Sequence, residues 1–129
     1  MENKAIFMHG TNDMIWKEIP VPEIGEEDVL IKVEAVGICG SDMHYYQHGK
    51  IGSFIVDGDF ILGHEAAGKV VEVGAKVKDL KVGDRVAMEP GVTCGKCEFC
   101  VTGKYNLCPD VEFFATPPYH GVFANYVKH

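Results

Sequence analysis

The segment Val29-Leu30-Ile31-Lys32-Val33-Glu34-Ala35-Val36 decides the fold class of this chain. Its residues at positions 29, 31, 33 and 35 are apolar and share one face of an extended backbone, whereas Lys32 and Glu34 lie on the opposite face. Alternation with a period of two residues is typical of a β-strand that is buried on one side only. The segment therefore predicts a half-buried strand.

Similar patterns predict further short strands along the chain. They occur at residues 4–8, 14–18, 69–73, 84–88 and 121–127. Glycines stand at most of the junctions, and many short strands with glycine turns favour a small barrel or sandwich over a helical fold. Helix is expected only as one or two turns near residues 41–47 and 103–106. Residues 47–59 and 109–120 are expected to form surface loops.

Size and charge narrow the class of protein. A chain of 129 residues can bury the core of one domain without disulfides. The net charge of −7 argues against a nucleic-acid partner, which would require a basic face. No apolar run is long enough for a signal peptide or for a membrane span, so no membrane partner is expected. We expect a cytoplasmic protein, whose clustered thiols stay reduced.

Four of the five cysteines lie close together, as Cys94-x2-Cys97-x2-Cys100-x7-Cys108. Zinc prefers tetrahedral sulfur, and Cys-x2-Cys spacing lets two thiolates reach one ion from a tight turn. Four thiolates leave no open position on the ion, so the cluster predicts a structural zinc site in a loop over residues 91–109.

Three other interpretations of the cysteine cluster are open, and ordinary core cysteines are the least favoured at this density. Disulfides would require an oxidising compartment. An iron–sulfur cluster is suggested by Pro109 after Cys108, but ferredoxins place about three residues before that last cysteine, and this chain places seven. Zinc is the interpretation that we favour.

The fifth cysteine, Cys39, stands apart from the cluster and has possible companions in His64 and Glu65. One thiolate, one imidazole and one carboxylate could hold a metal ion and leave a coordination position free. Each residue also has an ordinary interpretation, because a single cysteine is most often a buried apolar residue. The spacing alone leaves this second metal site open.

The pattern Gly63-His64-Glu65-x2-Gly68-x5-Gly74-x2-Val77 resembles that of the zinc-containing medium-chain alcohol dehydrogenases. The stretch Cys39-Gly-Ser41-Asp-x-His44 precedes this pattern and the four-cysteine loop follows it, in the order and at the separations seen in that family. The resemblance covers essentially the whole chain and is nearest to sorbitol (L-iditol) and xylitol dehydrogenases. It implies a mainly β fold, the GroES-like, partly open β-barrel of the catalytic domain, over residues 1–129.

The resemblance also implies roles for single residues. Cys39 and His64 would bind a catalytic zinc ion, with Glu65 as a direct ligand or a close partner. Ser41 and His44 would pass a proton to solvent while a zinc-bound alkoxide of a secondary alcohol loses hydride to NAD(P), giving a ketone. The substrate, a small-molecule alcohol or polyol, would contact side chains in a cleft. These are Tyr45, Ile51, Phe54, Phe113 and Phe114.

The chain contains no Gly-x-Gly-x-x-Gly turn of a Rossmann domain, which the family uses to bind its nicotinamide. By resemblance, that domain and a third protein ligand of the catalytic zinc lie beyond His129. We therefore expect an isolated chain that is inactive, with zinc in the four-cysteine site and a weakly occupied Cys39 site. The full-length enzyme is expected to form a homo-oligomer. A non-catalytic zinc module and a chaperonin-like structural module are the alternatives.

Overall fold

The computed structural model describes all 129 residues, Met1–His129, and is mainly β, as predicted. In chain order its elements are β1 (Asn3–Gly10), β2 (Asp13–Ile19), β3 (Val29–Gly37), α1 (Gly40–His48), β4 (Lys50–Ile51), β5 (Phe54–Ile55), β6 (Phe60–Ile61), β7 (Glu65–Val73), β8 (Arg85–Ala87), β9 (Gly91–Val92), α2 (Glu98–Val101), η1 (Tyr105–Leu107), β10 (Glu112–Phe113) and β11 (Tyr126–Lys128).

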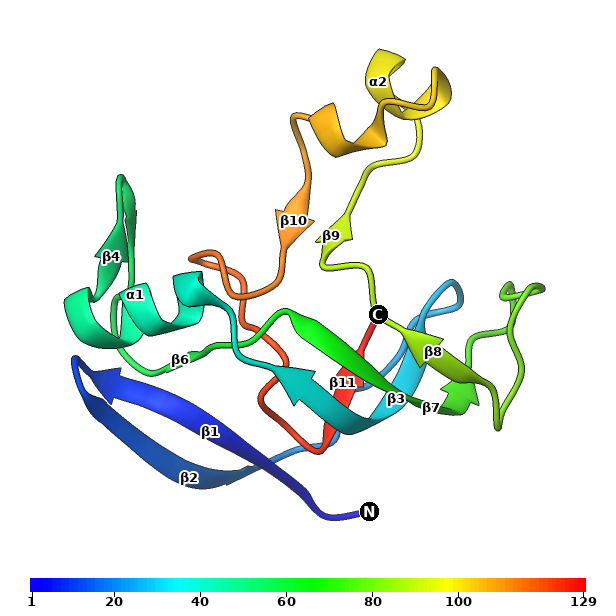
Figure 1. Cartoon of the computed structure of the whole chain (residues 1–129). Helices are drawn as coiled ribbons and strands as arrows, with labels where there is room; N and C mark the ends of the chain where they lie inside the picture. The colour runs from blue at the N-terminus through cyan, green and yellow to red at the C-terminus, as the bar shows by residue number, and fades with distance from the viewer.

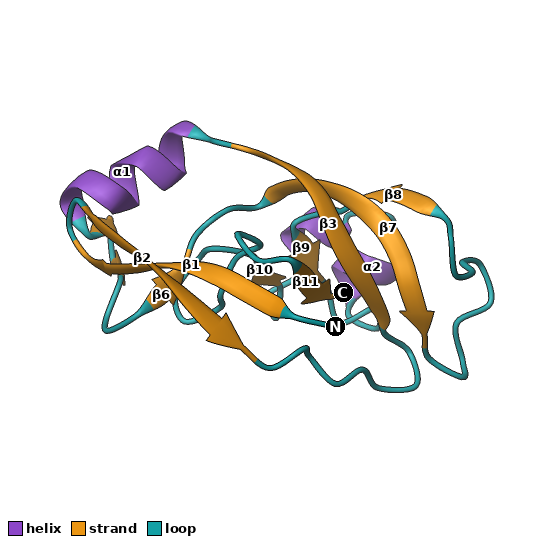
Figure 2. Cartoon of the chain, turned by 90° about the horizontal axis from the view of Figure 1, so that it is seen from below, coloured by secondary structure: helices purple, strands orange, loops and turns teal.

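Two antiparallel sheets form the body of the molecule (Figure 1). One has the strand order β11-β3-β7-β8 and the other the order β2-β1-β6. Seen from below, the β1–β2 hairpin and the long β3–β7 pair run along different sides of the body, and the sheets do not close into a continuous cylinder (Figure 2). The expected GroES-like, partly open barrel is therefore confirmed.

The main core lies on the inner face of β3 and β7. Val29, Ile31, Val70 and Val122 are among its buried residues. The strict alternation expected along residues 29–36 is broken, because register shifts occur in the β3–β7 pairing at Leu30/Ile31 and at Val33/Ala35. After such a bulge the side chains change faces, so Val36 packs against the core and Ala35 is exposed.

Close contact between β3 and β7 depends on Gly68. A β-carbon added at Gly68 would lie 2.2 Å from the carbonyl oxygen of Lys32, closer than any side chain can approach a backbone atom. Gly68 is paired with Val33 in the register of the two strands. Glycine is therefore required at this position for the sheet to form with its observed spacing.

A second apolar cluster holds α1 against the smaller sheet. Met8, Tyr45, Phe60, Leu62 and Ala115 are its buried members. Tyr45 is 4% exposed and comes from α1, whereas Met8 and Phe60 come from β1 and β6. This packing fixes the position of the helix that begins next to Cys39.

Some element boundaries differ from the sequence-based expectation. Residues 47–59 contain the short β4–β5 hairpin, and residues 109–120 contain β10. The helical turn expected near 103–106 forms as η1, and α2 precedes it as a further short helix. Of the strand expected over 121–127, only β11 forms, with one isolated bridge between Ala5 and Ala124. Short segments are shaped by their contacts with the rest of the molecule more than by local pattern.

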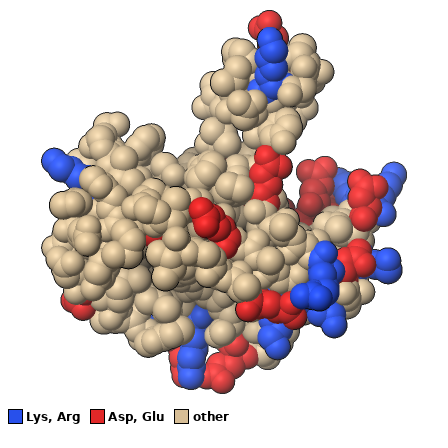
Figure 3. All heavy atoms as spheres, in the orientation of Figure 1, with Lys and Arg blue, Asp and Glu red and all other residues tan.

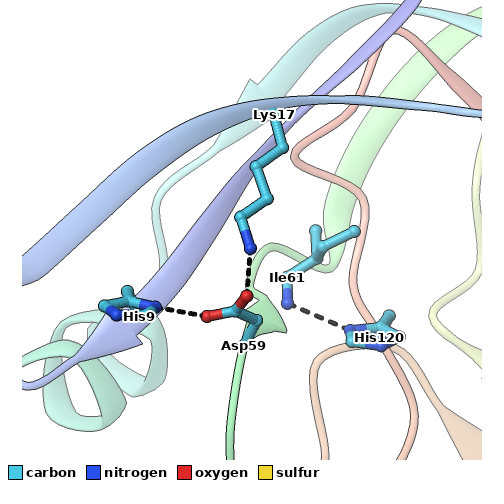
Figure 4. Close-up of polar contacts among 5 residues, drawn as sticks. All are labelled: His9, Lys17, Asp59, Ile61 and His120. Atoms are coloured by element: carbon cyan, nitrogen blue, oxygen red, sulfur yellow. Dashed lines mark hydrogen bonds and ion pairs between the residues drawn. The ribbon is translucent and has the colours of Figure 1, made fainter.

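Polar contacts connect the smaller sheet at one edge (Figure 4). The carboxylate of Asp59, just before β6, accepts hydrogen bonds from His9 of β1 and from Lys17 of β2. The backbone N–H of Ile61 donates to Nδ1 of His120 at 3.1 Å. His120 thus links β6 to the segment that precedes β11.

The segment from β9 to β10 projects from the body as a separate lobe that carries α2 and η1 (Figure 1). On the face shown in Figure 3, charged side chains of both signs gather around the β7–β8 side, and the region around α1 has few. None of the helices has the length and apolar character needed to cross a bilayer.

Candidate metal centres

The register of β3 and β7 brings Cys39 and His64 together. Gly37, the last residue of β3, is paired with Glu65, the first residue of β7. Because the strands are antiparallel, the residues just after Gly37 lie opposite those just before Glu65. Cys39 and His64 therefore meet at one end of the sheet, where the chain turns from β3 into α1.

The ligand atoms of Cys39, His64 and Glu65 all lie within 4.8 Å of one another. Cys39 is half-buried, the His64 side chain is 13% exposed and that of Glu65 is 53% exposed. Nε2 of His64 lies 4.0 Å from a carboxylate oxygen of Glu65. A β-carbon at Gly37 would lie 2.7 Å from the other carboxylate oxygen, so this glycine leaves room for Glu65.

Asp42 connects the turn that carries Cys39 with the turn that carries His64. Its side chain is 3% exposed and accepts hydrogen bonds from the backbone N–H of Cys39 and from that of Gly63, each at 3.0 Å. One of its oxygens also lies 3.6 Å from Nδ1 of His64. A carboxylate on this side of the ring leaves Nε2 to face Cys39 and Glu65, which is the arrangement commonly found for histidines that bind metals.

The donor atoms of this group suit a zinc ion. Thiolate sulfur, imidazole nitrogen and carboxylate oxygen are the ligands that zinc takes in proteins, at about 2.0–2.3 Å from the metal. Donor atoms within 4.8 Å of one another can reach a common ion with small rotations of their side chains. Glu65 is exposed, so the group is open on one side.

Ser41 and His44 lie on the first turns of α1, directly after Cys39. Ser41 is half-buried and His44 is exposed. The helix therefore leads from the metal group to the surface of the molecule. Their role in moving a proton stays a prediction.

The residues expected to line a substrate cleft lie in different environments. The Phe113 ring, on β10, is centred 5.7 Å from the His64 ring, beside the metal group. Phe114 packs partly against the main core, with its ring 5.6 Å from that of His129. Tyr45 belongs to the second core cluster, where burial raises the pKa of its hydroxyl. Of these three residues, Phe113 is the one whose ring packs beside that of His64.

The sulfur atoms of Cys94, Cys97, Cys100 and Cys108 form the second metal-binding group, in the lobe. Sulfur separations are 3.5 Å for Cys97–Cys100 and 3.9 Å for Cys94–Cys100, and all four cysteines are free thiols. Four sulfurs placed tetrahedrally at about 2.3 Å from a zinc ion would lie about 3.8 Å apart. The cluster has the dimensions of a closed Zn(Cys)4 site.

Backbone N–H groups around the lobe point at these sulfurs. Cys94 Sγ accepts from the N–H of Cys97 at 3.3 Å, and Cys97 Sγ accepts from that of Cys100 at 3.5 Å. Hydrogen bonds from the N–H groups of Lys96 and Cys97 lower the pKa of the Cys94 thiol to about 6. Such donors favour the thiolate form that a metal needs.

Sequence reasoning missed the part played by Asp42. The signal was available, because an acidic residue three positions after a residue that begins a helix is typical of a capping box. Its contact with Gly63 and His64 spans more than twenty residues of sequence and could be found only from the fold.

Comparisons with known proteins agree with this description. The alcohol dehydrogenase GroES-like domain matches residues 25–129. Sorbitol dehydrogenases from Bacillus subtilis and Rattus norvegicus are 59% and 52% identical to the chain over 97% and 99% of its length. A crystal structure of an Escherichia coli oxidoreductase of unknown specificity superposes over 100% of the chain with a TM-score of 0.90 and 46% identity. The chain spans 35% and 36% of the two sorbitol dehydrogenases and 38% of the E. coli chain.

Proposed function

This chain belongs to the family of the alcohol dehydrogenase GroES-like domain, and from that membership we propose that it supplies the catalytic zinc site of an NAD(P)-dependent alcohol or polyol dehydrogenase. The reaction is the oxidation of a secondary alcohol to a ketone. The observation that carries the proposal is the convergence of Cys39, His64 and Glu65 at one end of the β3–β7 pair. We also propose that residues 1–129 form one domain, with a structural zinc loop at 91–109.

In this proposal Cys39 and His64 hold the zinc ion, and Glu65 is a direct ligand or a close partner. A zinc ion with these ligands acts as a Lewis acid that favours ionisation of a hydroxyl group. Asp42 keeps the His64 ring turned so that Nε2 faces the metal group. Burial distinguishes the roles of the two carboxylates. Asp42 is enclosed and orients His64, whereas Glu65, the ligand or close partner of the zinc ion, is open to solvent.

The oxidation also requires a proton and a hydride to leave the substrate. We propose that the proton passes to the hydroxyl of Ser41 and then to His44, which is exposed and can exchange it with water. The hydride goes to NAD(P). Phe113 would exclude water from one side of the substrate, because its ring lies beside His64.

The relatives support a polyol as substrate, since two of them are sorbitol dehydrogenases at 59% and 52% identity. We propose a small polyol, with a cytoplasmic location in which the free thiols of the chain stay reduced. A homo-oligomer of the whole enzyme, without a nucleic-acid or membrane partner, completes the proposal.

Cobalt titration tests the metal site directly. Zinc is first loaded into the four-cysteine site, and Co2+ is then added while its visible absorption is followed. We expect one further Co2+ per chain with a thiolate signature, and binding at least tenfold weaker in Cys39→Ser and His64→Asn. His9→Asn, which changes an exposed histidine elsewhere, is the control. Unchanged Co2+ binding in Cys39→Ser would contradict the proposed catalytic site and favour the alternative that the chain is a non-catalytic zinc module.

Activity is tested in the complete gene product. Formation of NAD(P)H is compared for sorbitol, xylitol and a simple secondary alcohol, with Cys39→Ser as the inactive reference. Turnover by Cys39→Ser equal to that of the unchanged enzyme would contradict the proposed role of the site.

A further inference from the structure

Two histidines on α1 lie against each other at the surface. His44 and His48 are four residues apart, so their side chains project from the same face of the helix. Their ring centroids are 4.7 Å apart with an interplanar angle of 49°. Both residues are exposed.

These two imidazoles have no other polar partner. The remaining four histidines each contact a polar group: His9 contacts Asp59, His64 contacts Asp42 and Glu65, His120 contacts the Ile61 amide, and His129 contacts the Glu89 carbonyl. His44 and His48 make no hydrogen bond or ion pair with the protein. Their ring nitrogens are therefore free to bind something from solution.

The separation of the rings fits a shared metal ion. An ion bonded to one nitrogen of each ring at about 2.0–2.1 Å, with bonds about 90–110° apart, would hold the two centroids about 4.5–5.2 Å apart. The observed 4.7 Å lies inside this interval. Little rearrangement would be needed for chelation, and the ion would keep water in its other positions.

The end of the helix also favours a cation. His48 is in the last turn of α1, which ends at Gly49 in the left-handed conformation. The carbonyl end of a helix carries partial negative charge. The net charge of −7 acts in the same direction over the whole molecule.

We propose that His44 and His48 form a surface site for divalent transition metals, separate from the two cysteine-containing groups. Imidazole suits Cu2+, Ni2+ and Zn2+ and does not suit Mg2+ or Ca2+. Two protein ligands make the site weak and reversible, and the usual order of affinities places Cu2+ first. The proposal goes beyond the proposed dehydrogenase function and does not depend on it.

The site has a consequence that does rest on the proposed function. His44 would carry the proton of the alcohol outward, and a metal bound to its ring would occupy a nitrogen that accepts protons. Excess Ni2+ or Zn2+ would then inhibit the dehydrogenase through α1, and a variant lacking His48 would resist this inhibition.

Copper bound to iminodiacetate is a suitable probe. The chelator leaves adjacent positions open for two imidazoles and competes with capture of copper by the thiolates, which are filled with zinc beforehand. Electron paramagnetic resonance then counts the nitrogens bound to copper. We expect two imidazole nitrogens in the unchanged chain, and at least tenfold weaker binding with a single imidazole in His48→Gln.

The matched control, called the exchanged variant, moves one histidine to a position that does not face His44. The double variant Met43→His/His48→Gln keeps all six histidines of the chain, but the adjacent exposed positions 43 and 44 project from different faces of the helix. It should behave like His48→Gln, while His9→Asn should behave like the unchanged chain. Equal copper binding in the exchanged variant, or binding that disappears in Cys39→Ser instead, would overturn the proposal. Circular dichroism of each variant checks that α1 is still folded.

Discussion

The carboxylate of Asp42 lies 3.6 Å from Nδ1 of His64, although the two residues belong to different elements. Asp42 is in the first turn of α1, and His64 precedes β7. The same carboxylate accepts hydrogen bonds from the backbone of Cys39 and of Gly63. One buried side chain therefore fixes the turn that presents the thiol and the turn that presents the imidazole.

Replacement of Asp42 by Ala should affect both stability and metal affinity. The backbone N–H of Gly63 would lose its acceptor in a buried position and that of Cys39 in a partly buried one, at a cost of about 1–3 kcal/mol for the buried group and less for the other. Loss of the carboxylate behind His64 should weaken Co2+ binding by about 10–100-fold. Urea unfolding and cobalt titration measure the two effects. Asp42→Asn, which keeps one oxygen acceptor, should lose less of both.

The exposed residue Asp57 provides the control for this change. Its substitution by Ala should alter the free energy of unfolding by no more than about 0.5 kcal/mol. Equal urea midpoints for Asp42→Ala and Asp57→Ala would show that Asp42 does not hold the junction.

Gly68→Ala should destabilise the chain strongly. The new methyl group would lie 2.2 Å from the carbonyl oxygen of Lys32, and the two central strands would have to separate. We expect a loss of about 3 kcal/mol or more, seen as a lower urea midpoint or as failure to fold. Gly10→Ala is the matched change, because no atom lies within 4 Å of its added β-carbon. If both variants unfold alike, the strand spacing does not depend on Gly68.

Cys108→Ser should remove the metal of the lobe and unfold it locally. Cys108 is 3% exposed, and its sulfur accepts a hydrogen bond from the N–H of Cys94. Because the lobe contains few buried apolar residues, its metal should supply most of its stability. Metal analysis should show one zinc fewer per chain, and hydrogen exchange should show loss of protection from β9 to β10. Cys39→Ser should leave this zinc in place; its loss there too would argue against two separate sites.

His120 should make stability depend on pH. Its Nδ1 accepts a hydrogen bond from the backbone N–H of Ile61, and desolvation where this otherwise exposed residue packs against the protein lowers the pKa of His120. As pH falls below about 6.5, the unfolded chain takes up a proton at this residue before the folded chain does, so stability decreases.

Urea midpoints at about pH 7.5 and 5.5 measure this effect. His120→Asn keeps a polar side chain without a titrating group, so the stability advantage of the unchanged chain over this variant should shrink toward pH 5.5. An advantage that is the same at both pH values would contradict the prediction.

Residue types and spacing predicted the parts of the structure that are local. The four cysteines lie within fifteen residues, and their sulfurs do converge. The strands with clear alternation, such as β1 and β7, form where expected. The family resemblance, confirmed by the match to residues 25–129, supplied the pairing of Cys39 with His64 that spacing alone left open.

Features that depend on contacts between distant segments could not be predicted in this way. The bulges of β3 arise from its pairing with β7, so the exposure of Ala35 was not visible in its own sequence. The hydrogen bonds that Asp59 accepts from β1 and β2 connect residues more than forty positions apart. Tyr45 illustrates the same limit, because its burial depends on β1 and β6.

The alignment of β3 with β7 gives the metal group a diagnostic use. Sliding one strand by two residues would restore the backbone ladder but would displace Cys39 from His64 by about 6.6 Å. Gly37 and Gly68 oppose such a shift, because it would move larger residues into their places. The Glu65 side chain beside Gly37 and the Lys32 carbonyl beside Gly68 leave no room for a larger residue. Affinity for cobalt would therefore report, in a single measurement, whether β3 and β7 of a refolded sample are paired in the native register.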